Sequence, residues 1–219
     1  MKYEPYVARA LQANLGPGGV FLDVGSHFGL WSVYTASIIG KTGKVFAFEP
    51  SPAFAVLKEN AVLNPRVRYF NMGVGAQDGE VTFFEQGTAT SGSFVKEVTV
   101  INEEWQPAVP IAEIKVKIRS LDTLITELDI RPDLIKVDVE GFEFEVISGS
   151  EKILRSISPV LLIEIHPPQL KLSGGSDLAL IAFLESRGYT VEVIDRNPNS
   201  IYTILARLTK VNKAAAAGV

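Results

Sequence analysis

A chain of 219 residues, 47% of them hydrophobic, can bury one sizeable core and need not be divided into two domains. Its formal net charge of −4 and the lack of a basic run argue against a nucleic-acid partner. No stretch approaches the roughly 18 apolar residues of a membrane span, so we expect a soluble, cytoplasmic protein. Without cysteine, the chain has no thiolate nucleophile, and a metal ion would need His, Asp or Glu ligands.

Short runs of β-branched and aromatic residues predict the strands of a parallel sheet. The runs are continuously apolar rather than alternating, which is typical of strands buried on both faces. Two further strands near the end of the chain are expected to form an antiparallel edge pair. In chain order, the predicted strands cover 19–24, 44–49, 67–71, 134–139, 160–165, 189–194 and 201–208.

Helical patterns fill the segments between these strands. Ser51 is predicted to be an N-cap with Pro52 at the first helical position, and Asn64 ends that helix. A later helix is expected to begin at about Ser176 and to end before Gly188. Strands that alternate with helices in this order predict a doubly wound α/β sheet.

Residues of about 75–120 interrupt this alternation. The segments "EVTFFE" (80–85) and "EIKVKIRSL" (113–121) alternate in polarity like exposed strands, with a long Ser-, Gly- and Pro-containing stretch between them. We expect an inserted hairpin with a long loop, and such loops often act as lids or binding loops. The final "KAAAAGV" (213–219) is predicted to be a flexible tail, which leaves a single domain over 1–212.

The stretch "FLDVGSHFG" (21–29) places two glycines where the first strand leads into a helix. In an open parallel sheet, ligands bind outside the carboxyl ends of the strands, where the strand order reverses beside the first strand. Gly25 and Gly29 let the backbone approach a ligand closely, and Glu49 at the end of the second strand is placed to bind ribose hydroxyls. Together they predict a nucleoside-containing cofactor.

Two classes of cofactor fit such a turn. A dinucleotide site needs a glycine two residues after Gly25, but His27 stands there and obstructs a diphosphate. Asp23 suits a cofactor with a positive amine and sulfonium, and His27 can lie near its carboxylate. These residues favour S-adenosylmethionine, and the alternatives are a cofactor-binding module without catalysis and, less favoured, a nicotinamide-dependent oxidoreductase.

Ordered sequence blocks along most of the chain resemble the FkbM family of S-adenosylmethionine-dependent methyltransferases. The blocks are "FLDVGSHFG", "VFAFEPSP", "VGAQDGEVTFFE", "SGSF", "SLDTLI", "IKVDVEGFEFEVISG" and "LLIEIHP". The resemblance implies a class I methyltransferase (Rossmann-like) fold, with a mostly parallel seven-stranded sheet, helices on both faces and the insert after the third strand. It also implies, usually, methyl transfer to a hydroxyl oxygen. Ser26, His27 and Phe28 depart from the family's common "DVGANIG".

The resemblance further implies which residues bind the cofactor. The methionine end is expected at the first turn, the ribose at Glu49 and the adenine after the third strand. Tyr3 and Glu4 are expected to approach from the N-terminal side. The cofactor-binding residues are then Asp23, Gly25, Ser26, His27, Gly29, Glu49, Pro50, Asn71, Met72 and Asp138.

The fourth and fifth strands end in "VDVEG" and "IEIHP", which brings Asp138, Glu140, Glu164 and His166 to one edge as candidate catalytic residues. Methyl transfer requires an aligned acceptor oxygen and removal of its proton. His166 is the predicted base, because histidine titrates near neutral pH. Alternatively, Asp138 and Glu164, with or without His166, hold magnesium or manganese, which lowers the hydroxyl pKa.

Substrate contacts are expected in the inserted loop. Because "SGSF" lies beyond the first inserted strand, Ser91 and Ser93 are predicted to contact the acceptor and to cover the methyl-donor edge. The sequence therefore predicts an S-adenosylmethionine-dependent O-methyltransferase that acts on a hydroxyl group of a small molecule or a sugar.

Overall fold

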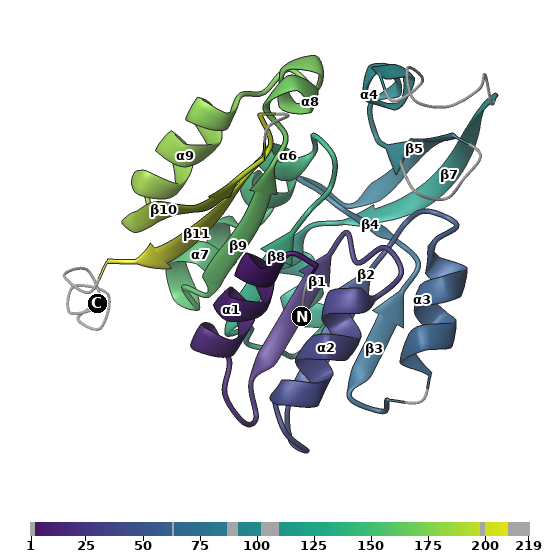
Figure 1. The fold of residues 1–219 in the computed structure, drawn as a ribbon. Helices are drawn as coiled ribbons and strands as arrows, with labels where there is room; N and C mark the ends of the chain where they lie inside the picture. The colour runs from purple at the N-terminus through teal and green to yellow at the C-terminus, as the bar shows by residue number, and fades with distance from the viewer. Residues whose placement is uncertain (1–2, 63, 87–91, 102–109, 198–199, 210–219) are drawn as a thin grey trace.

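The computed structural model describes residues 3–62, 64–86, 92–101, 110–197 and 200–209. Within these residues, the central element is a seven-stranded sheet in the order β10-β11-β9-β8-β1-β2-β3 (Figure 1). Its strands are β1 (Val20–Val24), β2 (Lys44–Phe48), β3 (Val67–Phe70), β8 (Leu134–Val137), β9 (Val160–Ile165), β10 (Tyr189–Arg196) and β11 (Tyr202–Leu208). All seven predicted strands are present, with ends that shift by one or two residues.

The direction of each strand explains where a ligand site forms. β1 pairs in parallel with both β2 and β8, so the strand order reverses beside β1 as predicted. β11 is antiparallel to both β9 and β10, which confirms the antiparallel pair. The last strand therefore lies inside the sheet, and β10 forms the edge.

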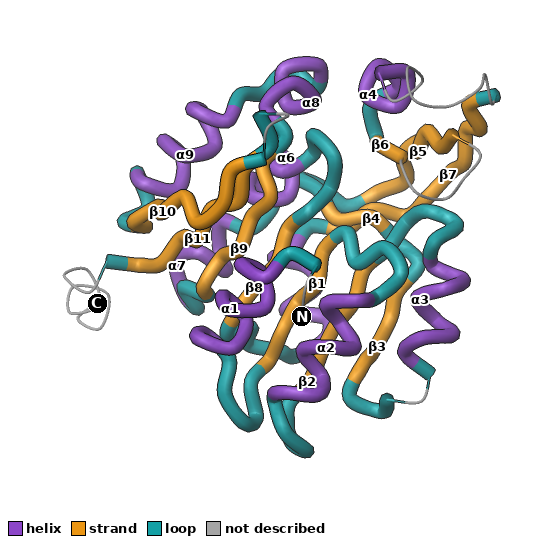
Figure 2. Tube along the Cα trace, in the orientation of Figure 1, coloured by secondary structure: helices purple, strands orange, loops and turns teal. Residues whose placement is uncertain are grey.

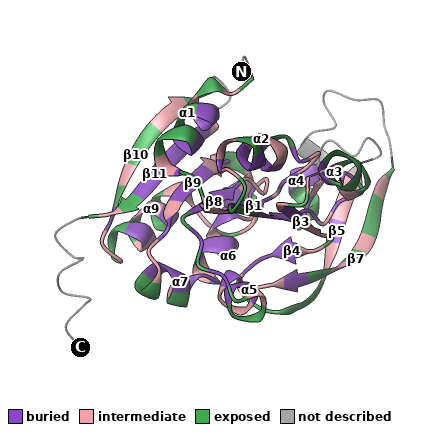
Figure 3. Cartoon of the chain, turned by 90° about the horizontal axis from the view of Figure 1, so that it is seen from below, coloured by how far each residue is buried: buried purple, intermediate pink, exposed green. Residues whose placement is uncertain are grey.

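Helices cover both faces of this sheet (Figures 1 and 2). Successive strand residues point to opposite faces, so Phe21 packs in one apolar core and Leu22 in the other. The core around Phe21 includes α1 (Pro5–Asn14), α2 (Leu30–Ile38) and α3 (Phe54–Ala61). The core around Leu22 includes α5 (Leu121–Leu128), α6 (Glu143–Ser148), α7 (Glu151–Ser156), α8 (Pro167–Leu172) and α9 (Asp177–Glu185). Figure 3 shows the buried strands between these layers.

The helix ends test the predicted caps. Ser176 caps α9, because its side chain accepts a hydrogen bond from the amide of Ala179, and Gly188 follows the helix with a φ of 81°. The predicted cap at Ser51 is wrong, because α3 begins only at Phe54. The Ser51 hydroxyl instead accepts a hydrogen bond from the amide of Ala53, within a turn that precedes α3.

The inserted segment forms a second, four-stranded sheet in the order β4-β7-β5-β6. β5 (Gly79–Gln86) and β7 (Ile111–Arg119) pair antiparallel, which confirms the predicted hairpin. β4 (Gly73–Val74), β6 (Gly92–Ser93) and α4 (Lys96–Ile101) complete the insert (Figure 1). Parts of the predicted loop, at 87–91 and 102–109, and the tail 213–219 lie outside the described residues. Among the helices that the structure describes, none combines the length and hydropathy needed to cross a membrane.

Candidate active site

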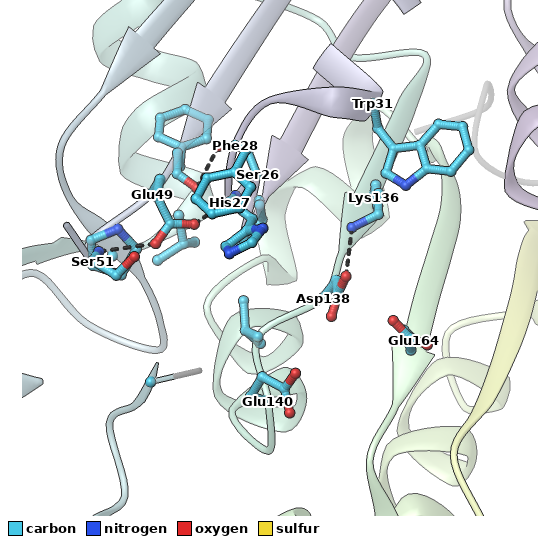
Figure 4. Close-up of a pocket in the computed structure, with 18 of the residues that line it drawn as sticks. Ser26, His27, Phe28, Trp31, Glu49, Ser51, Lys136, Asp138, Glu140 and Glu164 are labelled. Carbon is cyan, nitrogen blue, oxygen red and sulfur yellow. Dashed lines mark hydrogen bonds and ion pairs between the residues drawn. The ribbon is translucent and has the colours of Figure 1, made fainter. Parts of the chain in front are cut away.

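A cavity of about 590 Å³ opens at the carboxyl ends of β1, β2, β8 and β9 (Figure 4). Side chains from the first turn, from the strand ends and from the insert meet in its wall. Tyr3 and Glu4 also line it, and the indole nitrogen of Trp31 donates to Glu4 Oε2 at 3.0 Å. Of the predicted site residues, those in the wall are Gly25, Ser26, His27, Glu49, Pro50, Met72, Asp138, Glu140, Glu164 and His166.

Four of the predicted residues lie behind the wall instead of in it. Asp23 faces α2, where the Ser32 hydroxyl donates to its carboxylate. Gly29 is the N-cap residue that precedes α2. The Asn71 side-chain amide donates to the backbone oxygen of Glu49 at 2.9 Å. Ser93 donates to the backbone oxygen of Glu140 at 3.1 Å. These contacts give supporting positions to Asp23, Gly29, Asn71 and Ser93, and Ser91 lies outside the described residues.

The turn after β1 is held against both neighbouring strands. Gly25 has a φ of 75°, and a Cβ at this position would lie 1.8 Å from the backbone oxygen of Asp138. The amides of Gly25 and Ser26 both donate to the backbone oxygen of Phe48 at 3.1 Å. Only glycine at position 25 allows β1, β2 and β8 to end this close together. This explains why the sequence pattern has a glycine there.

Glu49 connects this turn to the end of β2. Its Oε2 accepts from the amide of His27 at 2.7 Å, and its Oε1 accepts from the amide of Ser51 at 2.9 Å (Figure 4). The side chain is buried, with 6% of the residue exposed, and burial raises its pKa even though these hydrogen bonds oppose the rise. Glu49 thus shapes the turn as well as presenting a carboxylate to the cavity.

A buried lysine partly neutralises the negative charge of the acidic side chains near the end of β8. Lys136, 4% exposed, donates to Asp138 Oδ2 at 2.9 Å and lies 4.0 Å from Asp23 Oδ1. Burial alone would raise the pKa of Asp138, but the charges of Lys136 and His166 hold it below its usual value. Sequence reasoning missed Lys136, although a lysine inside the apolar run "LIKVDV" was a visible signal.

The histidine of the cluster is bound to a second buried acid that sequence reasoning also missed. His166 Nδ1 lies 2.8 Å from Oε1 of the fully buried Glu143, and Nε2 lies 3.6 Å from Glu140 Oε2. Burial lowers the pKa of His166, but the hydrogen bond to Glu143 and the neighbouring carboxylates outweigh it and raise the pKa to about 10. His166 is therefore a cation near neutral pH, which disfavours the predicted role as a base.

The two remaining acids, Glu164 and Glu140, both have raised pKa values. Burial and the neighbouring charge of Asp138 raise the pKa of Glu164 to about 8. Glu140, from the loop after β8, also has a raised pKa, mainly because of burial. Asp138, Glu140 and His166 offer ligand atoms that lie within 4.8 Å of one another, whereas Glu164 is not part of that group.

The sheet order, with one antiparallel strand beside an edge and a cavity next to β1, is that of class I methyltransferases. The crystal structure of a methyltransferase FkbM from Methylobacillus flagellatus shares this fold. It has a TM-score of 0.58 and 16% sequence identity, over 86% of this chain and 43% of that chain. The predicted fold class is thereby confirmed.

The Methyltransferase FkbM domain matches residues 23–191, and the chain therefore belongs to the FkbM methyltransferase family. It is 31% identical to the hexuronic acid methyltransferase AglP of Haloferax volcanii, over 76% of this chain and 64% of that protein. It is 29% identical to the 2-O-methyltransferase NoeI of Sinorhizobium fredii, over 63% of this chain and 60% of that protein. The chain thus spans less than two thirds of the length of these relatives.

Proposed function

We propose that the protein transfers a methyl group from S-adenosylmethionine to a hydroxyl oxygen of a sugar or another small molecule. The observation that carries this proposal is the meeting of two features in one cavity. The Gly25 turn and Glu49 form its cofactor side, and Asp138, Glu140 and Glu164 form its reactive side. Membership of the FkbM family supports the same reaction.

The described residues fit S-adenosylmethionine. The tight approach of Gly25 to Asp138 leaves the turn without a side chain where the methionine part would lie. Glu49 offers a buried carboxylate to ribose hydroxyls, and Phe48 and Met72 offer apolar surface to an adenine ring. The ionised Asp138 favours a positive sulfonium close by.

When bound, the cofactor supplies an electrophilic methyl group on a positively charged sulfur. Transfer would form a bond between the acceptor oxygen and this methyl carbon, break the sulfur–carbon bond to leave a neutral thioether, and pass the hydroxyl proton to a base of the protein. The chain must therefore align the hydroxyl and provide for its proton. Because His166 already carries a proton, the carboxylates of Asp138 and Glu140 are better suited to hold the hydroxyl group and to accept its proton.

A sugar suits this wall because several acceptors stand side by side. Glu140 and Glu164 can accept hydrogen bonds from neighbouring hydroxyl groups, which fixes the orientation of a ring. Two relatives, a hexuronic acid methyltransferase and a 2-O-methyltransferase, agree with methylation of this kind.

Transfer of a labelled methyl group tests the proposal. The protein is incubated with S-adenosylmethionine and separate acceptors: neutral hexoses, hexuronic acids, phenols and RNA. We expect label in a carbohydrate product, with the methyl group on oxygen by NMR, and thermal stabilisation by S-adenosylmethionine but not by NAD. Stabilisation by NAD alone, label only in RNA, or cofactor binding with no transfer to any acceptor would contradict it.

A further inference from the structure

An imidazole and two carboxylates converge on one point of the cavity beside the expected methyl-donor position. Asp138, Glu140 and His166 each offer one ligand atom there, and these atoms lie within 4.8 Å of one another. We propose that the three side chains bind one divalent cation, with Glu140 rather than Glu164 as the third ligand. The role of this ion rests on the proposed function, whereas its binding does not.

The buried histidine is oriented as a metal ligand would be. His166 is only 2% exposed, and Glu143 Oε1 fixes its Nδ1 at 2.8 Å. Nε2 is therefore the nitrogen that faces the cluster, 3.6 Å from Glu140, and a bound cation would take the place of its proton. A ligating histidine usually donates its other ring N–H to a carboxylate in this way.

The two carboxylates are also held in place. Lys136 donates to Oδ2 of Asp138, and the carboxyl group of Glu164 also lies within hydrogen-bond reach of the Asp138 side chain. Glu140 has a φ of 49° and precedes Gly141, so the chain turns sharply after β8. Ser93 of the insert donates to the Glu140 backbone oxygen, which fixes this turn from the other side. A cation would need only a small contraction of the cluster.

The ligand set indicates which ion to use. Two carboxylates with one imidazole suit a first-row divalent ion such as Mn²⁺, and they accept Mg²⁺ less well because of the nitrogen ligand. Three protein ligands leave positions for water or for a hydroxyl oxygen of the acceptor. A hydroxyl group bound to such an ion loses its proton more readily.

Titration with Mn²⁺, followed by the loss of the free-ion signal in electron paramagnetic resonance, tests the site without any turnover. We expect one ion per chain. Glu140→Gln and His166→Gln should each weaken binding at least tenfold, and Glu143→Gln by about 10- to 100-fold through the orientation of His166. Glu97→Gln, the same chemical change on the exposed surface of α4, should bind like the wild type.

The following results would overturn the proposed ion site. It fails if the wild type binds no Mn²⁺ at millimolar concentration with or without S-adenosylmethionine. It fails equally if Glu164→Gln abolishes binding while folded Glu140→Gln retains it. Glu140 is not buried in the core, so this variant remains informative if His166→Gln does not fold. Calorimetry with S-adenosylmethionine on the same samples separates the two proposals: cofactor binding without Mn²⁺ binding rejects the ion alone, and Mn²⁺ binding without cofactor binding rejects the proposed function.

Discussion

Lys136 links two carboxylates that come from different strands. It forms a close ion pair with Asp138, whereas Asp23 lies farther away and its Oδ1 has no hydrogen-bond partner among the described residues. Burial accordingly dominates at Asp23, and it raises the pKa to about 6 against an ordinary value of 3.8, with Lys136 and Ser32 opposing the rise. Asp23 supports the cavity from behind at a cost in stability.

The pH dependence of stability should report this cost. The folded state binds the Asp23 proton more tightly than the unfolded state does. This proton binding therefore stabilises the fold fully below pH 3.8, and the stabilisation is lost as the pH rises through about 6. From pH 8 to pH 5, the wild type should gain about 1 kcal/mol of unfolding free energy relative to Asp23→Asn. Urea unfolding of both proteins at both pH values measures this change. If the difference in unfolding free energy between wild type and Asp23→Asn were the same at pH 5 and pH 8, the raised pKa of Asp23 would be contradicted.

Among the described glycines, Gly25 is the one at which an added methyl group should lower the stability of the fold most. In Gly25→Ala the new Cβ meets the backbone of Asp138 in a left-handed conformation, so we expect a loss of about 2 to 4 kcal/mol in stability. S-adenosylmethionine binding should be lost as well. The control is Gly79→Ala, whose Cβ would meet no atom within 4 Å, and equal behaviour of the two variants in urea unfolding would refute the argument.

Residues with a local sequence signature were predictable, and those defined by distant partners were not. Gly25 and Glu49 follow strands at a spacing that reflects how a βαβ unit binds a nucleoside, so their importance is visible in the sequence. Glu143 is buried, and one of its partners is His166, 23 residues away, which no local sequence pattern reveals. The base role predicted for His166 depended on a pKa that this hidden acid changes.

At the scale of elements, β6 connects the insert to the cavity. Ser93 holds the Glu140 backbone, and Phe94 lines the cavity while its ring packs against Phe83 and Phe142. The hairpin was predictable from the alternation in β5 and β7. The sheet that it forms with β4 and β6 was not, because strands of two residues carry no periodicity.

Ser93→Ala should therefore affect the acceptor more than the cofactor. Loss of one hydrogen bond to the Glu140 turn is worth about 1 kcal/mol, which corresponds to a roughly fivefold rise in the acceptor KM. The Kd of S-adenosylmethionine should stay within about threefold. Steady-state kinetics and calorimetry measure the two effects. Ser37→Ala removes a hydroxyl bonded only within α2 and serves as the control, and an equal effect of both changes would exclude the role of β6.

On the scale of the whole molecule, the two apolar cores cover the faces of the sheet and leave the carboxyl ends of its strands accessible to ligands. Helices cover both faces, so polar groups gather where β1, β2, β8 and β9 end, and the insert adds a wall at that end (Figure 1). The strand order that creates this end was predictable from the alternation of strands and helices. The contents of the wall depend on pairings such as Lys136 with Asp138, which only the folded chain reveals.

Calorimetric titration tests whether S-adenosylmethionine binds at this end of the sheet through the Glu49 turn. We expect one site per chain. Glu49→Ala should weaken binding about 10-fold to several hundred-fold, because charge-assisted hydrogen bonds are worth roughly 1.5 to 3 kcal/mol each. Glu97→Gln should leave it unchanged. Wild-type protein that binds no S-adenosylmethionine, or a folded Glu49→Ala variant with wild-type affinity, would exclude this binding site.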